Sequence, residues 1–288
     1  MPSHAAKKGG GRKGTAIMIV VLFLVGAAIM LYPAYSYLYN EYKNARTAAE
    51  YQEAVDASDE NELAEVMAAA KAYNKSHRVN VISDPFGEEG DAATIDEEYD
   101  ALLRKPGDEV MAYLDIPKIG QQLPVYHGSS NKVLEKGIGH LRGTSLPVGG
   151  KSTHSVVSGH RGLPSSKLFT DLDQLEVGDK FFFHVLGENL AYQVEKIQVV
   201  EPKQIDALAI QPDRDLATLV TCTPYGVNTH RMLITGHRVP YEEPEDETGA
   251  LSWFAAFSPQ TLALAGGLSL VVIVGLVVLV RRLKRRDR

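Results

Sequence analysis

Two long uncharged apolar stretches, one near each end, most constrain what this chain can fold into. The first runs through residues 14–40 with its apolar core at 16–32, and the second through residues 249–280 with its densest part at 262–280. Each core is close to the roughly 20 residues that an α-helix needs to cross a bilayer. Because no water is available there, the backbone must form its hydrogen bonds within the helix. The sequence therefore predicts two transmembrane helices, at residues 16–39 and 262–280.

The distribution of charge predicts how these helices are oriented. Four of the 30 Lys and Arg residues lie before residue 15 and six lie after residue 280. Basic flanks of this kind stay in the cytoplasm, so the tails at 1–15 and 281–288 are expected there and the middle of the chain outside. A cleaved signal peptide is the alternative for the first stretch, but no small-x-small cleavage site follows it. We therefore expect a two-pass protein of the cell membrane, in contact with the lipid bilayer.

The middle of the chain is acidic. It carries 35 of the 36 Asp and Glu residues against 20 Lys and Arg, a net charge near −15. Nucleic-acid binding requires a basic surface, so no nucleic-acid partner is expected.

Residues 40–106 are expected to form a helical segment followed by an irregular acidic one. Ser58 or Asp59 is a suitable N-cap for the helix, with Glu62 in its first turn. Residues 84–87 (DPFG) have the composition of a turn. Apolar residues recur at helical spacing: Leu63, Val66, Met67, Ala70 and Tyr73.

From about residue 107 the pattern changes to short β-like runs separated by loops with Gly and Pro. The absence of a regular βαβ alternation predicts a closed or sandwiched β domain at residues 107–240. Residues 241–261 are interpreted as an acidic linker and an interfacial segment with Trp253. The runs lie at residues 110–116, 122–126, 155–158, 180–186, 190–200, 217–222 and 231–239.

Cys222 is the single cysteine of the chain. It cannot form an intramolecular disulfide or by itself build a cysteine-based metal site. Its position, at the end of an apolar run and before a turn-like segment, suits presentation at an edge of the fold. A buried, inert thiol is the more common fate of a free cysteine. A free thiol outside the membrane is exposed to oxidation, however, and its retention suggests use.

A cysteine nucleophile needs a basic or cationic neighbour that favours its thiolate. Spacing alone cannot choose among nine histidines, but His160 ends a predicted strand between glycines and suits projection into a cleft. The alternative is a structural histidine. Arg231 follows Cys222 at a distance compatible with two adjacent antiparallel strands, where its guanidinium can donate to an oxyanion. An exposed strand arginine is the alternative, and Arg238 is an equally charged competitor.

Together these segments resemble a known family. Residues 218–222 (TLVTC) resemble the TLxTC signature of sortases, the cysteine transpeptidases of Gram-positive surfaces. Residues 158–162 (SGHRG) and 228–231 (NTHR) resemble the segments that carry the catalytic histidine and arginine of that family, in the same order along the chain. Residues 82–86 (ISDPF) resemble the lid of class C, the pilus-assembling sortases, as do residues 139–150, residues 163–173 and the two-span topology.

The resemblance implies a closed eight-stranded β-barrel with short helices, and a mechanism without cofactor or metal. Cys222 would attack the Thr–Gly carbonyl of an LPXTG-like sorting signal while Arg231 stabilises the oxyanion. His160 would protonate the leaving glycine amine. A lysine amine of another pilin subunit would resolve the thioacyl enzyme into an isopeptide bond, so the implied partners are pilin subunits with a sorting signal and an acceptor lysine.

The same resemblance gives the turn at residues 84–87 a role as a lid. Asp84 would pair with Arg231, Pro85 would stiffen the turn, and Phe86 would cover the thiol. A surface turn without catalytic contacts is the alternative. Two other functions stay open: a housekeeping-type sortase that anchors proteins to peptidoglycan, and a membrane-tethered binding ectodomain with an inert cysteine.

Overall fold

The computed structural model describes residues 11–77, 84–87, 96–104, 109–204, 206–243 and Gly275. The chain divides into two units, residues 1–38 with 250–288 and residues 39–249. The predicted second transmembrane helix, most of the predicted linker at 241–261 and the C-terminal tail lie outside the described residues, as do residues 1–10 of the N-terminal tail.

The first predicted transmembrane helix lies within a longer helix, α1 (Gly11–Asp56). Among the described helices, α1 is the one that is long and apolar enough to cross a membrane, and this fits a membrane anchor. Near its end, within the second unit, Tyr51 is buried: its hydroxyl donates to the carbonyl of Met111 at 3.2 Å and accepts from the N–H of Leu186 at 3.0 Å. Tyr51 therefore helps to fix the last turns of α1 to the folded domain, and Val55 packs in the same apolar cluster.

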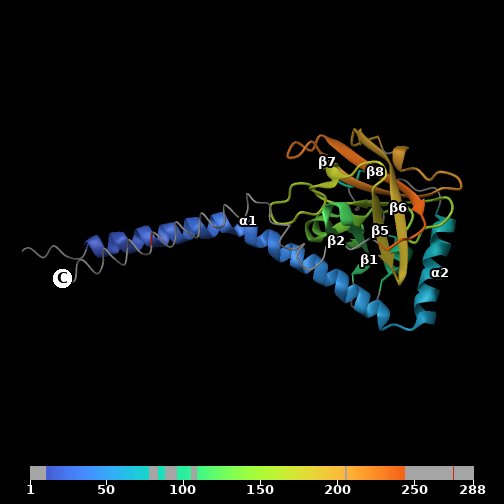
Figure 1. Ribbon diagram of the computed structural model, residues 1–288, viewed down its shortest axis with the longest axis horizontal. Helices are drawn as coiled ribbons and strands as arrows, with labels where there is room; N and C mark the ends of the chain where they lie inside the picture. The colour runs from blue at the N-terminus through green and yellow to red at the C-terminus, as the bar shows by residue number, and fades with distance from the viewer. Residues whose placement is uncertain are drawn as a thin grey trace, which may run out of the picture. The chain divides into compact units, whose positions relative to one another are not determined.

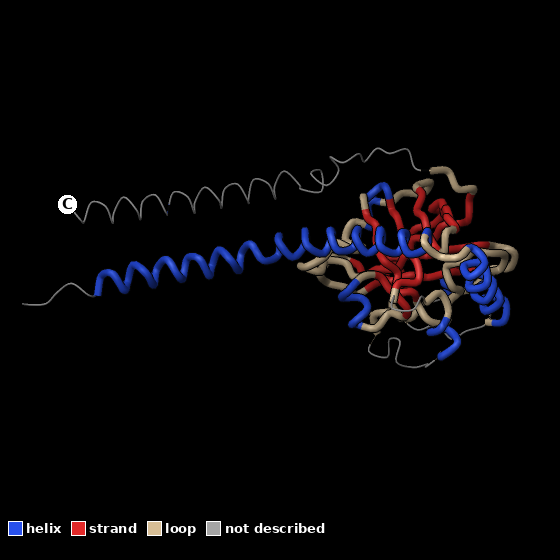
Figure 2. The backbone as a smooth tube through the Cα atoms, turned by 90° about the horizontal axis from the view of Figure 1, so that it is seen from below, coloured by secondary structure: helices blue, strands red, loops and turns tan. Residues whose placement is uncertain are grey.

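Helix α2 (Glu60–Ser76) begins at the predicted N-cap, because the Asp59 carboxylate accepts from the N–H groups of Asn61 and Glu62. Figures 1 and 2 show α2 running alongside the β domain. Its apolar face packs into the main core through Met67 and Tyr73. The apolar residues that recur at helical spacing in the sequence thus form the face of α2 that packs on the barrel.

The described residues contain eight strands that close into a barrel in the order β1-β2-β3-β4-β7-β8-β6-β5 (Figure 1). Pairs β2/β3 and β4/β7 are parallel and the others are antiparallel. The strands are β1 (Val110–Ile116), β2 (Gln121–His127), β3 (Ile138–His140), β4 (Thr153–Ser158), β5 (Lys180–Val185), β6 (Glu188–Val200), β7 (Asp215–Thr223) and β8 (His230–Val239). The short helices are α3 (Glu97–Ala101) and α4 (Asn131–Lys136), with 3-10 turns at Pro117–Ile119, Leu172–Gln174 and Asp206–Leu208.

The closed barrel expected from the resemblance is confirmed, and the seven predicted strands correspond to seven of the eight observed. The missed strand, β3, has three residues around Gly139 and pairs in parallel with β2. Its local sequence carries too few residues to show an alternating pattern. The barrel interior is a packed core, in which Phe181 stacks on Tyr192 at 5.7 Å between ring centroids and contacts Phe183 edge-on.

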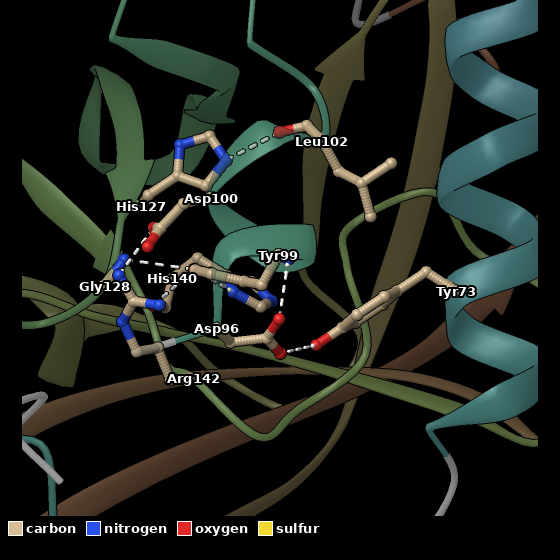
Figure 3. A network of polar contacts seen from close by, with 9 residues as sticks. All are labelled: Tyr73, Asp96, Tyr99, Asp100, Leu102, His127, Gly128, His140 and Arg142. Carbon is tan, nitrogen blue, oxygen red and sulfur yellow. Dashed lines mark hydrogen bonds and ion pairs between the residues drawn. The ribbon is translucent and has the colours of Figure 1, made fainter. Parts of the chain in front are cut away.

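Helix α3 is attached to the barrel through a buried tyrosine, Tyr99, and through an ion pair between Asp100 and Arg142. The Tyr99 hydroxyl lies 3.0 Å from Nδ1 of His140 and accepts from the N–H of Gly128 at 3.0 Å (Figure 3). The other ring nitrogen of His140 lies 2.8 Å from the carbonyl oxygen of Ser145, so that nitrogen carries the proton and Nδ1 accepts. The guanidinium of Arg142 lies over the Tyr99 ring, 4.6 Å from its centroid.

A second contact joins α3 to α2. The Tyr73 hydroxyl, near the end of α2, donates to the Asp96 carboxylate at 2.7 Å, and the same carboxylate caps α3 by accepting from the N–H of Tyr99 (Figure 3). This bond thus joins the end of α2 to the start of α3, the two elements that precede and follow residues 84–87 in the sequence.

Candidate active site

The parallel pair β4/β7 places His160 and Cys222 at the same end of the barrel. Ser158, the last residue of β4, is paired with Val220 of β7. Because parallel strands have their carboxyl ends on the same edge, the residues that follow both strands emerge side by side. His160 comes two residues after β4, and Cys222 is the last but one residue of β7.

Arg231 joins them from the neighbouring antiparallel strand. Cys222 of β7 and Arg231 of β8 are directly opposite each other in the register, as the spacing of the two residues predicts. A turn whose N–H groups at Val227 and Asn228 donate to the carbonyl of Pro224 connects the two strands. Both residues are buried, with 6% of Cys222 and 8% of Arg231 exposed.

The competing arginine lies elsewhere. Arg238 is paired with Tyr192 near the other end of β8, and its guanidinium lies 5.7 Å from the centre of that ring. Of the two arginines, the barrel therefore brings only Arg231 to the cysteine.

Asp84 holds the Arg231 guanidinium through a bidentate ion pair. Nε and Nη2 of Arg231 donate to the two carboxylate oxygens of Asp84 at 2.8 and 2.7 Å, a bidentate pair. Nη1 donates to the carbonyls of Asn228 and His230, each at 3.1 Å. The guanidinium is thus directed by β8 and its preceding turn and occupied by a carboxylate that lies 147 residues away in sequence.

The predicted turn at residues 84–87 is present, and it places Phe86 against two of the three candidate residues. The N–H of Gly87 donates to the carbonyl of Asp84 at 3.1 Å. The Phe86 ring lies 5.7 Å from the His160 ring between centroids, and 5.2 Å separate its centroid from the Arg231 guanidinium. Pro85 is buried. The turn at residues 84–87, which we call the lid turn, therefore contacts His160 and Arg231.

Burial in this arrangement favours the neutral forms of both candidate reactive groups. Desolvation raises the pKa of the Cys222 thiol; the Arg231 charge opposes the rise and the Asp84 charge adds to it. Desolvation also lowers the pKa of His160, against the opposing charge of Glu135. With the lid turn in place, the site therefore favours a neutral thiol and a neutral imidazole.

Gly159 shows why a glycine precedes His160. A Cβ atom there would lie 2.8 Å from the Phe169 ring and 2.9 Å from the Ile138 side chain, both fully buried. The sequence shows the glycine but not these neighbours, which come from strand β3 and from the loop that follows His160. The close packing fixes the path of the backbone into His160.

A separate cavity of about 530 Å³ lies at the other end of β7 and β8. Lys71, Lys75, Lys151, Asp215 and Arg238 are among its lining residues, and it includes none of the three candidate residues. Among the described residues, no cluster of three His, Cys, Asp or Glu residues is suited to hold a metal ion.

Comparison with known proteins agrees with this geometry. The family model described as the Sortase domain matches residues 114–239. Sortase D of Bacillus subtilis is 30% identical over 129 residues, which is 44% of this chain and 62% of that protein, so the match covers less than two thirds of its length.

Solved structures cover more of the chain. Sortase C of Streptococcus pneumoniae is 43% identical, with a TM-score of 0.65 over 69% of this chain and 100% of that one. Sortase C-1 of Actinomyces oris is 48% identical, with a TM-score of 0.58 over 62% of this chain and 99% of that one. This chain therefore belongs to the sortase family of cysteine transpeptidases, and its structural neighbours are class C sortases.

Proposed function

We propose that this protein is a membrane-anchored class C sortase that joins pilin subunits through isopeptide bonds. The observation that carries the proposal is the bidentate pair between Asp84 and Arg231, which sets a lid turn on the arginine directly opposite Cys222. Two further facts support it. The Streptococcus pneumoniae neighbour is described in connection with pilin substrate specificity, and a Streptococcus agalactiae neighbour in connection with a pilus island.

In the proposed reaction, the Cys222 thiolate attacks the Thr–Gly carbonyl of an LPXTG-like sorting signal. Arg231 donates hydrogen bonds to the oxyanion that forms. The tetrahedral intermediate collapses by breaking the C–N bond, and protonated His160 gives its proton to the leaving glycine amine. The threonine acyl group is then held as a thioester on Cys222.

The second half transfers this acyl group to a lysine amine of another pilin subunit. His160, now neutral, accepts a proton from the attacking amine, and the C–S bond breaks as the thiolate leaves. The energy of the cleaved peptide bond is conserved in the thioester, so the new isopeptide bond requires no further energy source.

The lid turn is proposed to hold the site inactive at rest. Asp84 occupies the guanidinium that the oxyanion would need, and its charge helps to raise the pKa of Cys222. When the lid turn leaves, Arg231 loses its carboxylate partner and acts on the thiol alone. The pKa of Cys222 then falls, so the movement that opens the site also favours the thiolate.

The membrane arrangement is part of the proposal. Residues 16–39 and 262–280 would span the bilayer with both tails in the cytoplasm, and the catalytic domain at 107–240 would lie outside. The apolar character of α1 supports the first span, and the uncharged stretch before the C-terminal basic run supports the second.

The test uses the full-length protein in membranes with a purified pilin that carries an LPXTG-like signal. The expected product is a ladder of covalent pilin oligomers that resists boiling in SDS, absent with the matched variant Cys222→Ala. Transfer to peptidoglycan fragments without oligomers would instead indicate a housekeeping-type sortase. Pilin binding that is unchanged in Cys222→Ala, with no covalent product in either protein, would indicate a binding ectodomain.

A further inference from the structure

The chain just before His160 is hydrogen-bonded to the residue just before Cys222. The Thr221 hydroxyl donates to the carbonyl of Gly159 at 2.8 Å. This side-chain bond adds to the backbone bond from the N–H of Gly159 to the carbonyl of Val220, and it joins the residues that immediately precede the imidazole and the thiol. It fixes the two chains on one side of the candidate pair.

A side chain makes the matching contact just after the pair. Nη1 of Arg161 donates to the Thr223 hydroxyl at 3.3 Å. Arg161 follows His160 directly and Thr223 follows Cys222 directly, so the two proposed catalytic residues are bracketed on both sides by bonds between their neighbours.

The guanidinium of Arg161 has a fixed orientation. Its Nε donates to the carbonyl of Thr170 at 3.1 Å, and its Nη2 forms an ion pair with Asp173. Only 9% of the Arg161 side chain is exposed. Because the guanidinium is planar, the contacts to Thr170 and Asp173 fix the plane in which Nη1 donates, and the Thr223 hydroxyl accepts from it there.

We propose that Arg161 is a positioning residue that acts through Thr223 to set the spacing between the His160 imidazole and the Cys222 thiol. The inference rests on the proposed catalytic roles of these two residues. Proton transfer requires the two groups to be held in productive geometry, and a displacement of about 1 Å can cost on the order of 100-fold in rate.

The bond from Arg161 to Thr223 can be removed without removing the bonds by which Arg161 anchors its own loop. Anchoring of the loop after β4 needs only the bonds to Thr170 and Asp173, both of which lie in that loop. The bond to Thr223 instead crosses to the strand that carries the cysteine. A variant that removes this bond alone therefore tests positioning without removing the anchor.

Thr223→Val is that variant, because it removes the hydroxyl and keeps the branched shape of the side chain. With the full-length protein and a fluorogenic sorting-signal peptide, we expect kcat to fall about 10-fold or more, with KM within about 2-fold. Arg161→Gln should lower kcat at least as much, and the double variant should be no slower than Arg161→Gln. Alkylation of Cys222 by iodoacetamide should stay within about 2-fold of wild type, because it needs no imidazole.

The matched control is Arg214→Gln. Arg214 is also ion-paired with a carboxylate, that of Glu195, but it precedes β7 at the other end of the strand. This control should retain wild-type kcat.

A spectroscopic readout separates positioning from loss of fold. When the His160 segment loosens, water gains access to the ring and the pKa of His160 rises towards its ordinary value. NMR titration of labelled histidine should show this rise in Thr223→Val and not in Arg214→Gln.

Wild-type kcat in Thr223→Val, or a slow Thr223→Val with an unmoved His160 pKa, would overturn the inference. Failure of the proposed function gives a different result. In that case wild type itself forms no thioacyl enzyme with the peptide.

Discussion

Cys222 and Arg231 are opposite residues of two antiparallel strands, so the backbone ladder of β7 and β8 fixes their separation. The thiol and the guanidinium are therefore positioned by paired strands of the barrel, and only their third partner, His160, comes from a loop. Rigid strands position reacting groups more precisely than loops do.

The first prediction concerns the shape of the Arg231 side chain. Arg231→Lys keeps the positive charge but loses the planar fork, so it should stabilise the oxyanion poorly. We expect kcat for the sorting-signal peptide to fall by about 100- to 1,000-fold, the effect of losing one oxyanion donor. Arg238→Lys, in the same strand but paired with Tyr192, is the control and should stay near wild type. Equal losses in both variants would contradict a specific role.

The second prediction concerns the lid turn. Replacing Asp84 and Phe86 together by alanine removes the pair with Arg231 and the ring contact with His160. The rate at which a small thiol reagent modifies Cys222 should rise, by about 10-fold if the pair holds the turn closed by about 1.4 kcal/mol. An unchanged rate would show that the turn does not guard the thiol.

The third prediction is a pH dependence. Burial raises the pKa of the Cys222 thiol above its ordinary value of 9.0, with the Asp84 charge as a contributing cause. Only the thiolate reacts, so the alkylation rate of wild type should rise with pH through a midpoint above that value. Asp84→Asn removes the charge, and its midpoint should lie at lower pH. A midpoint that stays or moves upward would mean that Asp84 does not act on the thiol.

The fourth prediction concerns acid stability. Burial lowers the pKa of His140 to about 4, from 6.5. The folded state keeps this ring neutral, while the unfolded state takes up a proton below pH 6.5. The contribution of the neutral His140 ring to the free energy of unfolding is therefore complete above pH 6.5. This contribution, on the order of 3 kcal/mol, is lost as the pH falls towards 4.

Urea unfolding between pH 7 and pH 4 measures this loss. His140→Gln should be less stable than wild type at pH 7 but should show a shallower dependence on pH. His230→Gln, at an exposed position, should keep the wild-type slope. A His140→Gln slope as steep as that of wild type would place the proton uptake at another group.

The fifth prediction concerns the glycine before His160. Gly159→Ala would place a methyl group 2.8 Å from the ring of Phe169. Such overpacking costs about 1–3 kcal/mol in the free energy of unfolding. Because the displaced backbone leads into His160, kcat should fall as well. A fully stable and active variant would show that this part of the chain adjusts freely.

Much of the fold follows from local sequence. Strands such as β1 and β5 are long enough for their apolar runs to show, whereas β3 has three residues and owes its place to its pairing with β2 and β4. The N-cap of α2 at Asp59 was also predictable, because capping is a local interaction.

The residues of the candidate site were predictable where their spacing in the sequence or the family resemblance identified them. The eight residues between Cys222 and Arg231 indicated adjacent strands, and the register agrees. Spacing alone did not select His160, because its nearness to Cys222 depends on the β4/β7 pairing. The contact between Arg161 and Thr223 left no local signal, since the two residues are 62 positions apart.

The pair between Asp84 and Arg231 has a consequence for how a substrate competes for the site. The lid turn belongs to the same chain, and the elements on either side of it, α2 and α3, are joined by the bond between Tyr73 and Asp96. A tethered occupant of this kind acts at an effective concentration on the order of millimolar. A free sorting signal at lower concentration therefore competes poorly with the lid turn. Its apparent affinity is its intrinsic affinity multiplied by the fraction of molecules in which the lid turn is open. In the proposed mechanism, the enzyme is thus selective for pilins concentrated beside it on the same membrane surface.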